Sequence, residues 1–102
     1  MNDYPTEEQL KLIEVWDFMD FENLAIFVQS IWHWGEEYAR LHDWRADEFN
    51  SPYRMFELIT GGWSGNESIV GSLNRNQMFN MMCWQASFRG GHHIYHIRKI
   101  KN

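Results

Sequence analysis

The chain has 102 residues, of which 44% are apolar and 17% aromatic, so it can form one domain with a hydrophobic core and is not intrinsically disordered. Residues 1–50 hold twelve acidic and three basic side chains, a net −9, whereas residues 51–102 hold two acidic and six basic ones, a net +4. The single cysteine, Cys83, excludes an internal disulfide, and no stretch approaches the ~20 apolar residues of a membrane-spanning helix.

Two helices are predicted in the acidic half. Thr6-Glu7-Glu8-Gln9 has the spacing of a capping box, which predicts a helix over residues 7–18. Asp20 is suited to cap a second helix. We predict this helix over about residues 21–42, because apolar and small residues recur there at three- and four-residue steps: Leu24, Phe27, Val28, Ile31, Gly35 and Tyr38.

Two more helices are predicted around the glycine-rich stretch at residues 61–67. Ser51-Pro52 is typical of a helix start, so residues 53–59 are expected to form a short third helix. Gly61 and Gly62 would end it. Ser64 and Glu67 have the spacing of another capping box, which predicts a fourth helix that runs to about Asn74.

The C-terminal part allows two interpretations. Residues 78–84 are rich in Met and aromatic side chains and could belong to a helix. The turn signal Arg89-Gly90-Gly91, followed by the β-forming run at 92–97, favours a hairpin with strands at about 79–88 and 92–100. On the hairpin interpretation, which we prefer, one face carries Met82, Trp84, Ala86 and Phe88, and the return strand carries Tyr95 and Ile97. The predicted fold class is α+β, with about four helices packed against a C-terminal two-stranded antiparallel hairpin.

The distinctive motifs are Gly61-Gly62-Trp63-Ser64-Gly65-Asn66-Glu67, Cys83-Trp84, Ser87 and Arg89-Gly90-Gly91-His92. Together they resemble a group of small proteins found in phages and prophages. The resemblance covers about residues 55–98 and brings no catalytic residues with it. It implies an accessory protein of a phage or mobile element, a class whose members often bind and block a host protein, including components of defence systems.

Several side chains suggest chemistry, and for each we favour a structural role. His92 and His96 lie roughly 13 Å apart on a strand, too far for one metal ion, and no carboxylate is near them in the sequence. Cys83 is expected to be a core thiol. The glycines at 61, 62 and 65 lack the lysine and the spacing of a nucleotide-binding loop, so no cofactor is expected.

The charge distribution also has two interpretations. We favour a folded dipole whose halves neutralise each other. The alternative is an acidic face that meets a basic partner, or a basic tail that meets an anion. Because the sequence pI is about 5.4, binding of nucleic acid is not expected. The N-terminus lacks a signal-peptide pattern, so we expect one cytoplasmic domain over residues 1–102 without membrane contact.

The sequence therefore suggests a non-enzymatic protein that binds a host protein and that can inhibit a host defence system. The expected contact residues are Trp63, Asn66, Trp84, Arg89, His92 and His93. The residues expected to shape this region are Gly61, Gly62, Ser64, Gly65, Glu67, Gly90 and Gly91. Two alternatives stay open: a small enzyme or ligand-binding module with a pocket between residues 61–67 and the hairpin, and a self-associating structural protein whose many aromatic side chains form its own interface.

Overall fold

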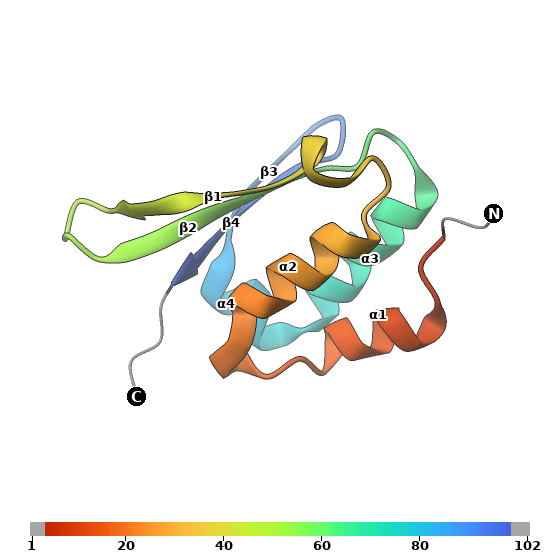
Figure 1. The fold of residues 1–102 in the computed structure, drawn as a ribbon, viewed down its shortest axis with the longest axis horizontal. Helices are drawn as coiled ribbons and strands as arrows, with labels where there is room; N and C mark the ends of the chain where they lie inside the picture. Colours follow the sequence, from red (N-terminus) through yellow and green to blue (C-terminus); the bar gives the residue numbers. More distant parts are fainter. Residues whose placement is uncertain (1–3, 99–102) are drawn as a thin grey trace.

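Four helices line one face of a four-stranded antiparallel sheet in the computed structural model, which describes residues 4–98 (Figure 1). The predicted α+β class is confirmed, but the sheet has four strands and not two. In chain order the elements are α1 (Glu7–Glu14), the 3-10 turn η1 (Phe18–Asp20), α2 (Phe21–Ile31), the 3-10 turn η2 (Gly35–Glu37), β1 (Ala39–Ala46), β2 (Pro52–Ile59), α3 (Ser64–Arg75), α4 (Gln77–Cys83), β3 (Trp84–Phe88) and β4 (His92–Arg98).

The long helix expected over residues 21–42 is wrong beyond Ile31. Trp34 and Gly35 both adopt left-handed backbone angles, with φ of 70° and 58°, and this reversal ends the helical path. Residues 39–46 then form β1. The helical spacing of the apolar residues was correct for α2, which buries Phe21, Leu24, Ala25 and Val28.

The short helix expected after Ser51-Pro52 is also wrong, because these residues begin β2. Asp47 closes the preceding turn with its carboxylate, which accepts hydrogen bonds from the backbone N–H groups of Phe49 and Ser51. The antiparallel register runs from Ala39–Leu58 to Ala46–Pro52. Pairing with β1 and β4 therefore overrides the local helix-start signal.

The C-terminal segment combines the two interpretations of the sequence. Residues 77–83 form α4, because the Asn76 side chain caps the N–H of Phe79 and Phe79 and Cys83 are both buried one turn apart. The predicted strand at 79–88 is therefore wrong for its first half. Residues 84–88 form β3, and a bulge after Trp84 breaks the expected common face.

The predicted hairpin itself is confirmed. β3 and β4 pair in antiparallel fashion, and Gly90 and Gly91 provide the positive φ angles of the turn, 86° and 81°. Tyr95 and Ile97 share a buried face, as predicted. The last two residues of the predicted strand at 92–100 lie outside the described residues.

The sheet order is β1-β2-β4-β3, so the second strand of each hairpin lies at the centre. Phe56 of β2 and Tyr95 of β4 are direct partners there, and both are completely buried beneath the helices. Each outer strand carries a bulge, between Leu41 and Trp44 in β1 and between Trp84 and Ala86 in β3. Apart from the 3-10 turns, the order helix, helix, strand, strand occurs twice, although the sequence shows no repeat.

Of the caps predicted at Thr6, Asp20 and Ser64, only the one at Thr6 forms the expected side-chain hydrogen bonds. Thr6 and Gln9 form the expected capping box, although α1 ends at Glu14 and not at residue 18. In α3 the capping position is occupied by Trp63, and the Ser64 hydroxyl donates to the Tyr4 hydroxyl instead of capping the helix. Asp20 precedes α2, but its carboxylate accepts from the Asn23 side chain. Within the described residues, no helix is long and apolar enough to cross a membrane.

Candidate functional site

Residues 61–67 contact the segment that follows α2 and fix its position through hydrogen bonds from Asn66 to His33. The Asn66 side chain is completely buried: its carbonyl accepts from the backbone N–H of His33 at 2.9 Å, and its amide donates to the carbonyls of His33 and Thr60, both at 3.3 Å. Asn66 was predicted as a contact residue, but its side chain has no exposed surface. Its side chain joins two segments of the protein's own backbone.

Two glycines of this stretch leave room for aromatic rings. A Cβ atom on Gly61, which has a φ of 63°, would lie 2.4 Å from the Trp34 ring. A Cβ atom on Gly65 would lie 2.4 Å from the Trp63 ring. Both indoles thus pack directly on backbone, which explains why glycine stands at these two positions.

The rings form a continuous series that we call the aromatic ladder: Tyr4, Trp63, His33, Trp34 and Tyr38. Successive ring centroids lie 4.8, 4.2, 4.3 and 5.1 Å apart. Trp63 stacks on Tyr4 and on His33 and is half-buried, so it lies at the boundary between the core and the surface. Trp34 has a left-handed backbone conformation, and 48% of its surface is exposed.

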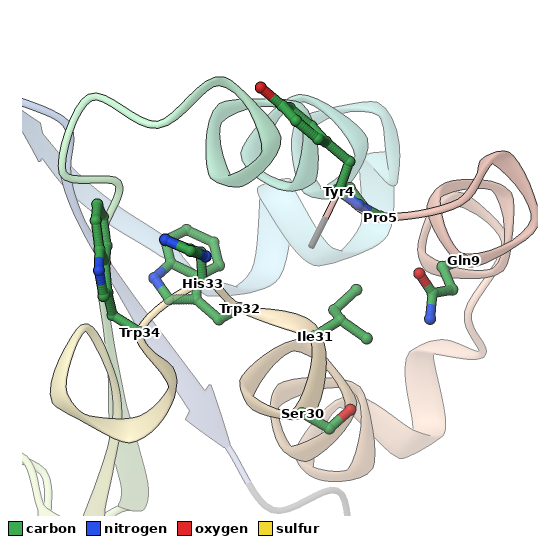
Figure 2. A pocket seen from close by; sticks show the side chains of 8 residues that line it. All are labelled: Tyr4, Pro5, Gln9, Ser30, Ile31, Trp32, His33 and Trp34. Atoms are coloured by element: carbon green, nitrogen blue, oxygen red, sulfur yellow. The ribbon is translucent and has the colours of Figure 1, made fainter. Parts of the chain in front are cut away.

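An open cleft of about 350 Å³ lies beside this ladder, between the beginning of α1 and the end of α2 (Figure 2). We call it the aromatic cleft. It is lined by Tyr4, Pro5, Gln9, Ser30, Ile31, Trp32, His33 and Trp34. Trp32 is fixed because its indole N–H donates to the carbonyl of Ile59 at 3.1 Å. The cleft does not lie between residues 61–67 and the hairpin, where a pocket was expected.

The turn between β3 and β4 contacts Thr60, which directly precedes the glycine-rich stretch. The backbone N–H of Thr60 donates to the carbonyl of Gly91 at 2.9 Å, and a Cβ atom on Gly91 would collide with the Thr60 side chain. Two of the predicted contact residues of the hairpin, Trp84 and His93, are joined through Ser87. Trp84 donates its indole N–H to Ser87, whose hydroxyl lies 2.8 Å from Nδ1 of His93.

The histidines of the sheet have a carboxylate neighbour that sequence reasoning missed. Glu57 of β2 lies 2.7 Å from Nε2 of His92 and 3.3 Å from Nε2 of His42. Burial alone would raise the pKa of Glu57, but the hydrogen bonds from His92 and His42 outweigh it and hold this pKa below its usual value. The β2–β4 pairing brings Glu57 to His92, and the β1–β2 pairing brings it to His42. Among residues 4–98, no group of three or more His, Cys, Asp or Glu side chains is arranged to hold a metal ion.

The remaining predicted residues have simple surroundings. Cys83 is a buried core thiol, as predicted, and burial raises its pKa to about 12. Arg89 and the turn glycine Gly90 are exposed. Glu67 lies exposed in the first turn of α3, where its negative charge suits the helix terminus.

A second surface was missed because its residues were expected in a strand. On α4 the spacing of Met78, Met81 and Met82 places three methionines on the outer face of the helix, with Met81 76% exposed. Trp84, 45% exposed, follows directly at the start of β3. We call these four residues the methionine surface. Residues 76–88 contain no charged side chain, whereas 23% of the whole chain is charged.

Comparisons with protein-family models, with curated proteins and with solved structures found no match for this chain.

Proposed function

We propose that this protein is a non-enzymatic binding protein of a phage or mobile element, which holds a host protein through the methionine surface. The observation that carries the proposal is the exposure of Met81 and Trp84 within a segment that has no charge over residues 76–88. The core of a protein interface is poor in charged residues and rich in methionine and aromatic side chains. The methionine surface has this composition.

The shape of these side chains also suits binding. Methionine side chains are flexible and polarisable and adapt to an irregular partner surface. Trp84 supplies a large ring whose orientation is fixed by its hydrogen bond to Ser87 at 2.8 Å. A rigid aromatic side chain beside adaptable ones is typical of a binding hot spot. The partner chemistry that fits is an apolar, uncharged patch on another protein.

The partner class that we propose rests on the resemblance to phage proteins. Small accessory proteins of phages often bind and block a host protein, and we propose a component of a host defence system as the partner. Inhibition then results from coverage of the host protein's own apolar contact surface. The protein works in the host cytoplasm on this proposal.

The test compares two equally exposed apolar residues. Met81 and Val15 are both 76% exposed, but Val15 lies at the end of α1, outside the methionine surface. Tagged wild-type protein and the Met81→Glu and Val15→Glu variants are incubated with host lysate, and the captured proteins are quantified by mass spectrometry. We expect one host protein that the wild type and Val15→Glu retain equally and that Met81→Glu loses at least tenfold.

Light scattering on the purified proteins completes the experiment. The proposal predicts that the wild type and Met81→Glu are monomers of the same mass. If the wild type is a dimer that Met81→Glu dissociates, the methionine surface serves self-association and the proposal is wrong. Equal capture of the same host protein by all three proteins would also contradict it.

A further inference from the structure

We infer that the aromatic cleft binds an organic cation, either a guanidinium or an alkylammonium group. This inference concerns a site distinct from the methionine surface and does not depend on the proposed function. Three features support it: the rings that line the cleft, the end of α2 that lies in it, and the charge of the surrounding segments.

The first feature is the ring face of Trp34. Tyr4, Trp32, His33 and Trp34 supply half of the lining residues (Figure 2). Trp32 is only 4% exposed and Trp63 stacks on Tyr4 and on His33, so the accessible face is that of Trp34, which is 48% exposed. The face of an indole or phenol ring carries negative potential and attracts a cation placed within about 6 Å of the ring centroid. An exposed tryptophan in an unfavourable left-handed conformation is held there by its surroundings, here by Gly61 beneath its ring. The chain thus maintains a costly arrangement that presents this indole.

The second feature is the C-terminal end of α2. Ser30 and Ile31 of its last turn line the cleft. The last carbonyl groups of a helix lack partners within the helix and give this end a partial negative charge. A basic side chain in the last turn usually compensates that charge, but α2 has none. A bound cation would occupy the place that such a side chain leaves open.

The third feature is the local charge. Residues 4–37 hold eight carboxylates and one basic side chain, Lys11. Two of these carboxylates, Glu14 and Glu22, are paired with Arg75 and Arg54. The other six have no Lys or Arg partner within the described part of the chain. The helices around the cleft therefore attract cations and repel anions.

The volume indicates the size of the bound group. A cleft of about 350 Å³ is at the lower end of the range for small-molecule sites, which suits one amino-acid-sized group. The lining amide of Gln9 and hydroxyl of Ser30 add polar groups for hydrogen bonds. An arginine or lysine side chain, presented by a peptide or supplied as a free molecule, has the matching size and charge.

The experiment is a titration followed by the indole N–H resonances in ¹H–¹⁵N NMR spectra, at constant pH and ionic strength. The probe is Nα-acetyl-arginine methylamide, and the control ligand is the citrulline analogue, which has nearly the same shape and no charge. We expect saturable shifts of the Trp32 and Trp34 resonances with the arginine probe and at least fivefold weaker binding of the citrulline analogue. Equal binding of the two ligands would overturn the inference.

Two pairs of variants test the site itself. Trp34→Leu should weaken binding about 3- to 10-fold, whereas Trp44→Leu, which removes a similarly exposed indole on β1, should leave it unchanged. Ser30→Lys places a built-in cation at the end of α2 and should abolish binding while it raises the melting temperature. Asn23→Lys adds the same charge to the first turn of α2, outside the cleft, and should leave binding within twofold. If Trp34→Leu does not fold, this pair of lysine variants still decides: unchanged binding by Ser30→Lys would overturn the inference.

A final titration distinguishes the two sources of the cation. A tetrapeptide that carries arginine between glycines is compared with the arginine probe alone. At least tenfold tighter binding of the peptide supports a protein side chain as the natural ligand, and equal binding supports a free small cation. Binding of neither ligand would overturn the inference.

Discussion

At the scale of single residues, Asn66 is the buried polar side chain that joins the separate segments of the candidate site through hydrogen bonds. Its amide satisfies two backbone groups of His33 and the carbonyl of Thr60 in a place that water does not reach. A buried backbone group without a partner costs more than an ordinary hydrogen bond contributes. Asn66 thereby fixes the position of His33 and, through it, the geometry of the aromatic ladder.

The Asn66→Ala substitution should lower the free energy of unfolding by about 2–4 kcal/mol, because it removes the hydrogen bond to the His33 N–H and one hydrogen bond to each of two carbonyls in a buried place. Urea denaturation followed by circular dichroism measures this loss. Asn74→Ala, an exposed position in the same helix, is the control and should change stability by less than about 0.5 kcal/mol. Equal effects of the two substitutions would show that the Asn66 hydrogen bonds contribute little.

At the scale of secondary-structure elements, α3 contains two glycines with opposite roles. Gly65 lies beneath the Trp63 ring, whereas a Cβ atom on Gly71 would meet only the flexible end of Arg75, at 3.5 Å. Neither glycine has a positive φ, so the backbone itself accepts alanine at both positions. A comparison of alanine substitutions at the two positions therefore reports on the contact between the Trp63 ring and the helix.

We predict that Gly71→Ala raises the free energy of unfolding by about 0.5–1 kcal/mol, because alanine favours the helix. Gly65→Ala should instead lower it by about 1–2 kcal/mol, because the Trp63 ring must move away from the new methyl group. Thermal and urea denaturation of both variants give the values. In the Trp63→Leu variant, Gly65→Ala should instead raise the free energy of unfolding. If Gly65→Ala still lowers the free energy of unfolding in that variant, the explanation is wrong.

Elements with local signals could be predicted from the sequence. The Thr6–Gln9 capping box located the start of α1, and the Arg89-Gly90-Gly91 turn located the β3–β4 hairpin. The β1–β2 hairpin was missed because Ser51-Pro52 imitates a helix start, whereas pairing of β2 with β1 and β4 stabilises a strand there. The reversal at Trp34 had no reliable signal, since a tryptophan with positive φ depends on Gly61 and Asn66, far along the chain.

The same reason limited the prediction of the site. The importance of residues 61–67 was visible from their glycines, but the segment that they hold, Trp32–Trp34, was assigned to a helix. The methionine surface could have been found from the i, i+3, i+4 spacing of Met78, Met81 and Met82, had residues 78–83 been assigned to a helix. Contacts between distant residues, such as Glu57 with His92, had no signal in a single sequence.

At the scale of the whole molecule, the two oppositely charged halves of the chain are joined by ion pairs. Each arginine–carboxylate pair among the described residues connects one residue of 1–50 with one of 51–102: Glu14–Arg75, Glu22–Arg54, Asp47–Arg98 and Arg40–Glu57. This agrees with the interpretation that the halves neutralise each other. Because most of these pairs are partly exposed, they contribute more to the arrangement of the halves than to stability.

The histidines of the sheet should make stability depend on pH. Burial and the nearby Arg98 and Arg45 hold the pKa of His96 below its usual 6.5, and Asp47 opposes them weakly. The unfolded chain therefore binds this proton more readily, so the free energy of unfolding should fall as the pH drops below about 6.5. His96→Phe, which keeps a ring against Tyr53, should flatten this decrease in urea denaturation between about pH 5 and 7.

The control for this experiment is Tyr53→Phe, which alters the same stacked pair without removing an imidazole. It should show the wild-type dependence on pH. The pKa of His93 is lowered as well, chiefly by burial, so part of the decrease should remain in His96→Phe. An unchanged decrease in His96→Phe would contradict the assignment. Below about pH 4.5 a further loss is expected as Glu57 takes up its proton.

The bulges of β1 and β3 have a consequence for how this molecule meets others. Each interrupts the row of backbone donors and acceptors along an outer strand, so a neighbouring chain finds only short matched runs at either side of the sheet. Addition of further strands at the sheet edges, a route to fibrils, is thereby disfavoured on both sides. Recognition is left to side chains, and an apolar helix such as α4 can remain exposed beside a sheet that does not grow.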